Sequence, residues 1–150
     1  MIVRQRILLF VCPHGAGKSR IAAAWFNGSA PPGWLATTAG ITPQTEVSEH
    51  APRLLAGTAV AELLDKAPPR PLTAVPGAAF TVAIDCPAEA VAPTVSWRLD
   101  NPGFDEAMGA ELRTRAQHLA GLLGGEHSRS ELEADRVIGP PDVEQATEVP

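Results

Sequence analysis

The chain of 150 residues has only two cysteines, two lysines and no tyrosine, and none of its apolar runs is long enough to span a bilayer. Two cysteines are too few for a disulfide-stabilised secreted scaffold, and they suit a reducing compartment. The twelve basic residues are scattered along a chain of net charge -5, which argues against a nucleic-acid binder because phosphate backbones are held by clustered Lys and Arg. No His, Cys, Asp and Glu set has metal-site spacing. We therefore expect a cytoplasmic protein without a cofactor or metal, which binds neither nucleic acid nor membrane.

The most informative stretch that is present, residues 7–26, predicts a buried strand, a tight loop and a helix. The apolar run over residues 7–11 suits a central parallel strand, and it stops at Cys12. Gly15 and Gly17 then break regular structure before apolar residues return with helical spacing. Small residues leave the backbone N–H groups free to converge at a helix N-terminus, where the helix dipole also favours an anion. The stretch therefore predicts an oxyanion-binding loop with a cysteine beneath it.

Cys12 has two interpretations. A cysteine at the end of a core strand is often a buried, inert thiol. Beside converging amides and a helix N-terminus, however, a thiolate is stabilised and becomes a nucleophile. The loop favours the second interpretation, so we predict that Cys12 is catalytic and that the oxyanion is bound by the residues after it, which are Pro13, His14, Gly15, Ala16, Gly17, Lys18 and Ser19.

This stretch resembles the start of the low-molecular-weight protein tyrosine phosphatase superfamily, which includes arsenate reductases coupled to thioredoxin or mycothiol. That family has a strand, then C-x5-R-S, then an Ala-rich helix, and here CPHGAGKS runs from Cys12 to Ser19 and is followed by RIAAAWF. Lys18 stands where the family has arginine, and Arg20 lies two positions later. Arginine offers a planar fork for phosphate or arsenate, whereas lysine offers a point charge. The resemblance implies a divergent member with weaker transition-state stabilisation.

Two later segments continue the resemblance in the same order. Residues 38–40 read TAG where the family has S-A-G after its second strand. The family then has a W-x2-D-D-P or D-P loop that delivers an aspartic acid to protonate the leaving oxygen. Here Asn101 fills the acid's place before the proline, so either Asp100 would have to swing in as the catalytic acid, or acid catalysis is absent. The alternative is that residues 100–103 form only a turn and a helix start.

Cys86 follows the apolar run over residues 80–85. The carboxyl ends of parallel strands face one crevice, so Cys86 could approach Cys12 there. The thioredoxin-coupled arsenate reductases resemble this region, but Pro93 stands where they have a further cysteine. Cys86 is therefore a candidate redox residue working with an external thiol reductant, or else a simple core thiol.

Two other classes of function start from the same loop. Residues 17–19, GKS, resemble the end of the nucleotide-binding loop G-x4-G-K-[ST], with Cys12 in place of the first glycine. Asp85, at the end of an apolar strand, would then be the magnesium ligand, although many parallel strands end in Asp without a metal. The other alternative is a catalytically weak or inactive relative that binds an oxyanion or a phosphorylated partner.

The predicted fold is one α/β domain over residues 1–125, with a doubly wound, four-stranded parallel sheet flanked by helices, followed by a flexible tail over residues 126–150. The strands are expected at 7–11, 34–38, 80–85 and 94–97, and the helices from residue 19, over 46–64 with an interruption at Pro52, and over 104–123. The predicted function is that of a thiol-based phosphatase or arsenate-reductase-like enzyme, in which Cys12 attacks a phosphate ester or arsenate.

Overall fold

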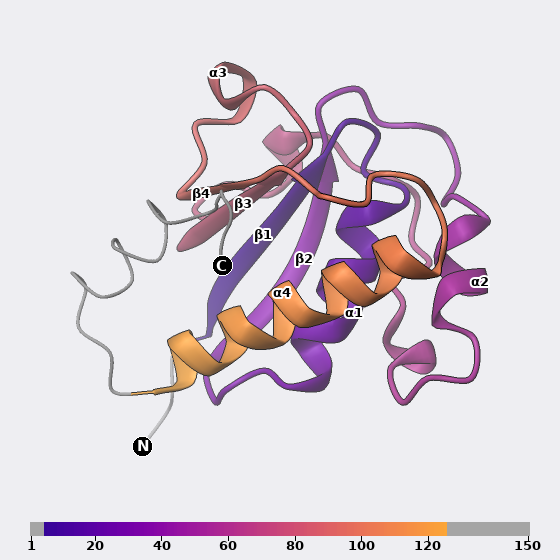
Figure 1. Ribbon diagram of the computed structural model, residues 1–150. Helices are drawn as coiled ribbons and strands as arrows, with labels where there is room; N and C mark the ends of the chain where they lie inside the picture. The colour runs from indigo at the N-terminus through magenta and orange to yellow at the C-terminus, as the bar shows by residue number, and fades with distance from the viewer. Residues whose placement is uncertain (1–4, 126–150) are drawn as a thin grey trace.

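The computed structural model describes residues 5–125 and contains a four-stranded, fully parallel sheet (Figure 1). This confirms the predicted fold class, while the tail predicted over residues 126–150 lies outside the described residues. The strands lie side by side in the order β2-β1-β3-β4. Their bounds are Arg6–Cys12 for β1, Trp34–Gly40 for β2, Phe80–Ile84 for β3 and Val95–Trp97 for β4.

Both faces of the sheet are covered, because the central strand β1 buries side chains on each of them. On one face, Leu8 and Phe10 belong to the main core, which is closed by α1 (Lys18–Gly28) and α4 (Glu106–Gly124). Figure 1 shows these two helices together on that side of the sheet. On the other face, Leu9 and Val11 contact apolar residues around η2 (Leu72–Ala74) and α3 (Ala88–Val91). The continuous apolar run of β1 follows from this double burial.

One sequence-based prediction is wrong: residues 46–64 do not form a single interrupted helix. Only α2 (His50–Leu55) and the short 3-10 helix η1 (Ala61–Leu63) form there. The segment before α2 is held by the cysteine loop instead, since the Ser48 N–H donates to the Ala16 carbonyl at 2.9 Å. After α2 the backbone turns at Gly57, which has φ +79°.

The end of β1 is the topological switch point of the sheet. From β1 the chain passes to β2 on one side, and it later returns to β3 on the other side. In open α/β sheets, ligands bind at such a point, outside the carboxyl ends of the strands. Cys12 ends β1 there and pairs in register with Gly40. Within residues 5–125, none of the helices combines the length and the apolar character that a membrane crossing requires. The cytoplasmic location stays a prediction.

Candidate active site

The loop between β1 and α1 turns its carbonyl groups outward. Six consecutive carbonyl oxygens, from residue 12 to residue 17, each accept a hydrogen bond from a group outside the centre of the loop. The donors are the N–H groups of Ile41, Thr42, Gln44, Ser48 and Ile21 and the Nε of Arg20, at 2.8 to 3.3 Å. Four of these six donors lie in residues 41–48, the segment that follows β2. This segment holds the loop from outside, and we call it the brace.

The N–H groups of the same loop are left for a ligand. Among the described residues, none of the seven backbone N–H groups of residues 14–20 has an acceptor. The N-cap of α1 is Gly17, and no side chain within residues 5–125 caps this helix end. Free amides at the N-terminus of an eleven-residue helix attract an anion through both hydrogen bonding and the helix dipole. The geometry is that of an oxyanion-binding loop.

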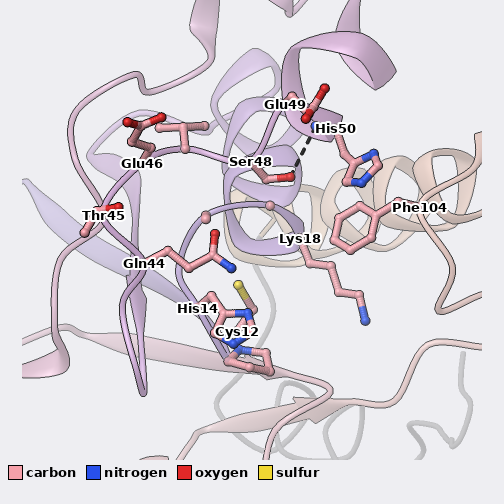
Figure 2. Close-up of a pocket in the computed structure, with 14 residues that line it drawn as sticks. Cys12, His14, Lys18, Gln44, Thr45, Glu46, Ser48, Glu49, His50 and Phe104 are labelled. Carbon is pink, nitrogen blue, oxygen red and sulfur yellow. Dashed lines mark hydrogen bonds between the residues drawn. The ribbon is translucent and has the colours of Figure 1, made fainter.

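Cys12 lies beneath this loop and in contact with the helix. Its Sγ is 3.2 Å from the Ser19 Oγ. The thiol donates in this arrangement, and an ionised sulfur would instead accept the hydroxyl proton of Ser19. The side chain is only 3% exposed, yet it opens onto a cavity of about 940 Å³. The cavity is lined by loop residues between Cys12 and Lys18, by residues 44–50 and by Phe104 (Figure 2).

Two glycines make the close packing of the loop against β2 possible. Gly15 has φ +64°, which favours glycine, and a Cβ there would lie 2.7 Å from the Gly40 nitrogen. A Cβ on Gly40 would lie 2.5 Å from the Gly15 nitrogen. Gly15 is the third residue after Cys12, and Gly40 is the last residue of the TAG segment. The glycine of the TAG segment is therefore required for steric reasons, because a larger residue there would collide with the loop.

Lys18 contributes its amide to the loop, but its ammonium group is engaged elsewhere. The Nζ lies 2.7 Å from Oδ2 of Asp85, and both side chains are largely buried. The other oxygen of Asp85 accepts the Leu99 N–H at 2.9 Å. Figure 2 shows the Lys18 side chain pointing away from the Cys12 sulfur. Lysine and aspartate, the two residues that a magnesium-nucleotide site would require, are thus bound to each other.

The predicted acid loop is anchored away from the cavity. Asp100 and Asn101 are exposed, and neither lines the cavity above Cys12 in the described part of the chain. Their backbone N–H groups donate to Glu111 of α4 at 2.9 and 2.8 Å. Although burial alone would raise it, the pKa of Glu111 is lowered by these two N–H groups and by Arg115. The structure therefore places Cys12 with its loop, but it does not bring Asp100 to them.

Cys86 lies on the other side of the sheet from the main core. It is half-buried among the residues that pack against Leu9 and Val11, and its Sγ is 3.6 Å from the Val11 carbonyl oxygen. Burial, with a smaller effect from the charge of Cys12, raises the pKa of the Cys86 thiol to about 11. Cys86 is therefore a protonated thiol at neutral pH. Both cysteines are free, and the redox role of Cys86 stays a prediction.

The cavity residues outside the loop, which are 44–50 and Phe104, were not predicted from the sequence as site residues. Gln44 belongs to the brace, and Figure 2 shows its carboxamide pointing toward Cys12. His50 and Phe104 form a wall of the cavity, with stacked rings whose centroids are 4.6 Å apart. Arg53 fixes this wall, since its Nη2 contacts the His50 Nδ1 at 2.7 Å and donates to the Phe104 carbonyl at 2.9 Å. No local motif marks these residues, because they come from three separate segments.

No protein-family model matches the sequence, and no functionally curated protein matches it. Solved structures do match. The arsenate reductase from Archaeoglobus fulgidus has a TM-score of 0.58 at 29% identity, over 76% of this chain and 98% of that one. The thioredoxin-dependent arsenate reductase of Corynebacterium glutamicum has a TM-score of 0.59 at 24% identity, over 79% and 62% of the two chains. A low molecular weight protein tyrosine phosphatase from T. tengcongensis has a TM-score of 0.55 at 18% identity, over 79% and 97%.

The sheet order, the cysteine at the end of β1 and the loop of free amides define an α/β domain with a cysteine beneath a loop of unpaired N–H groups, in the part of the chain that the structure describes. The chain has the fold of low-molecular-weight protein tyrosine phosphatases and arsenate reductases, as the sequence resemblance predicts.

Proposed function

We propose that this protein is a thiol-dependent phosphatase, in which Cys12 attacks a phosphate ester held by the loop amides. The observation that carries the proposal is the juxtaposition of the Cys12 sulfur with seven free N–H groups and the Ser19 hydroxyl. Support also comes from similar structures: one is an arsenate reductase in a phosphate-binding state, and another is a Cys-to-Ser mutant of an arginine phosphatase in which the active-site serine is phosphorylated.

The reaction takes place in two steps. The Cys12 thiolate attacks phosphorus, so that an S–P bond forms while the P–O bond to the leaving group breaks and its electron pair stays on the leaving oxygen. Water then attacks phosphorus, which releases inorganic phosphate and returns the electron pair to sulfur. The free N–H groups of the loop stabilise the phosphoryl oxygens in both steps. The Ser19 hydroxyl donates to the thiolate that leaves in the second step.

The position of the acid loop restricts the substrate. Asp100 and Asn101 are held by Glu111 and lie outside the cavity, so neither donates a proton to the leaving oxygen in this arrangement. An ester whose leaving group is already stable as an anion, such as an aryl phosphate, needs no such donor. We therefore expect slow turnover of aryl phosphates and much slower turnover of alkyl phosphates.

Arsenate chemistry at the same loop would require an external reductant. Arsenate attached to Cys12 must gain two electrons to become arsenite, and the raised pKa of Cys86, about 11, leaves that thiol protonated. A pair of external thiols would supply the electrons and become a disulfide. Phosphate-ester hydrolysis needs only Cys12 and water, so it is the function that these residues support best.

A second candidate function is oxyanion or phospho-partner binding with little or no turnover. The Lys18–Asp85 ion pair favours it, because the cation in the place of the family's arginine is neutralised at 2.7 Å. A site with loop amides alone would still hold a phosphate, but it would stabilise the transition state less.

Inorganic phosphate and sulfate are expected to raise the melting temperature, while ATP or GTP with magnesium is not. The loop amides bind a compact oxyanion, and a ligand at one hundred times its Kd stabilises the folded state by about 2.7 kcal/mol. Thermal-shift measurements with chloride at matched ionic strength provide the control. Stabilisation by nucleotides without stabilisation by phosphate would replace this proposal with the nucleotide-binding alternative.

A further inference from the structure

Arg20 is a charged side chain with no exposed surface, and it lies under the cysteine loop. Its Nε donates to the Gly15 carbonyl at 2.9 Å, which fixes the turn at the centre of the loop. Its Nη1 donates to the carbonyls of Asp65 and Ala67 at 2.6 and 2.7 Å. Its Nη2 is buried and has no partner among the described residues.

Two cations and one anion meet at Arg20, where Arg20 is buried and its neighbours Asp65 and Arg70 are partly exposed. Asp65 is 3.6 Å from the Arg20 Nη1, but it also forms an ion pair with Arg70 at 2.9 Å. Two guanidinium groups thus share one carboxylate. Burial lowers the pKa of Arg20, the negative charge of Asp65 raises it, the positive charge of Arg70 lowers it further, and the charge of ionised Cys12 has the smallest effect, which is to raise it. A thiolate at Cys12 would add a second negative charge to this cluster.

Such an arrangement is poor for stability alone. Burying a guanidinium is costly unless all of its donors are satisfied and its charge is paired. Here one nitrogen is unsatisfied and the paired charge is shared. A buried unsatisfied polar group in a folded protein calls for a functional explanation. The location of Arg20 directly behind the oxyanion loop supplies one.

We infer that Arg20, rather than Lys18, is the cation of this site: a positioning residue that fixes the Gly15 carbonyl outward and stabilises the Cys12 thiolate from behind the loop. The inference rests on the proposed function, because it assigns a role within the same thiol site. It also explains how the loop tolerates lysine in the place of the family's arginine. The cation that matters is two residues further along α1, where it acts through the loop and does not touch the substrate.

The other charged groups near Cys12 are less able to play this part. Lys18 is neutralised by Asp85. His50 is bound to Arg53, while Cys86 carries a high pKa and no charge at neutral pH. The remaining titratable groups that line the cavity are exposed to solvent, which screens them, and they are His14, Glu46 and Glu49.

The inference is tested by the pH dependence of Cys12 alkylation in a Cys86→Ala background, where Cys12 is the only thiol. Arg20→Met is expected to move the midpoint of the rate profile to higher pH and to lower the alkylation rate near neutral pH about tenfold, as for loss of one close opposite charge. Arg20→Lys should recover part of this loss, because it keeps the charge but not the bond to Gly15. Arg113→Met, which removes an exposed arginine stacked on Trp25, is the matched control and should leave the midpoint unchanged.

Asp65→Asn keeps the inference testable if the Arg20 variants do not fold. This change leaves Arg20 in place and removes the carboxylate that competes with the thiolate, so the midpoint should move to lower pH. An unchanged or raised midpoint in Asp65→Asn, or an unchanged midpoint in folded Arg20→Met, would overturn the inference. Alkylation requires no turnover: the expected shifts without phosphatase activity would contradict only the proposed function, and activity without the shifts would contradict only the role of Arg20.

Discussion

Cys12→Ser is expected to lower the hydrolysis of aryl phosphate to the uncatalysed background, a loss on the order of a thousandfold or more. A serine hydroxyl is a weaker nucleophile than a thiolate, and a serine oxygen is a poorer leaving group than sulfur in the second step, so turnover is lost even where the serine takes up a phosphoryl group. The loop amides are unaffected, and the variant should still be stabilised by inorganic phosphate. Steady-state kinetics with an activated aryl phosphate, together with thermal shift, measure the two effects separately.

Cys86→Ser is the matched control for this substitution. Cys86 packs on the opposite side of the sheet from the main core and has a pKa of about 11, so its loss should leave phosphate-ester turnover within a factor of about two. Equal activity of wild type and Cys12→Ser would mean that the observed hydrolysis is not carried out by this loop. A large loss in Cys86→Ser alone would mean that Cys86, and not Cys12, carries out the chemistry.

Gly40→Ala is expected to destabilise the protein by about 1–3 kcal/mol and to abolish stabilisation by phosphate. The added methyl group would lie 2.5 Å from both the Gly15 nitrogen and the His14 carbonyl carbon, and these are backbone atoms that cannot rotate away. The loop must therefore shift off β2, which displaces the N–H groups that are proposed to bind the phosphate. Chemical denaturation and phosphate titration provide the two measurements.

Gly121→Ala is the corresponding control, because Gly121 lies in α4 and a Cβ there meets nothing within 4 Å. Alanine favours a helix over glycine by about 1 kcal/mol, so this variant should be equally stable or slightly more stable. If Gly40→Ala keeps the stability and the phosphate response of the wild type, the loop does not depend on its contact with β2.

The fold and the cysteine loop could be predicted because their signals are local. The strand that leads to Cys12 is buried on both faces, so its residues are apolar without interruption. Gly15 breaks the chain where the backbone requires a positive φ. Such patterns within about ten residues are enough to place a strand, a turn and a helix start.

The partners of the site residues could not be predicted, because they are distant in sequence. Lys18 is paired with Asp85, 67 positions away, and no pattern around either residue indicates this. The anchoring of Asp100 depends on Glu111 of α4. The helix expected over 46–64 failed for a similar reason, since Ser48 donates its N–H to the cysteine loop. Tertiary contacts decided each of these positions.

The central claim is that Cys12 takes up the phosphoryl group, and trapping the intermediate tests it most directly. The protein is mixed with excess aryl phosphate and denatured rapidly, and the modified residue is located by peptide mass spectrometry. The expected result is one phosphoryl group on the Cys12 sulfur, which is absent from Cys12→Ala and retained in Cys86→Ser. Hydrolysis without any phosphoryl group on Cys12, or with the group on another residue such as His14, would contradict the claim.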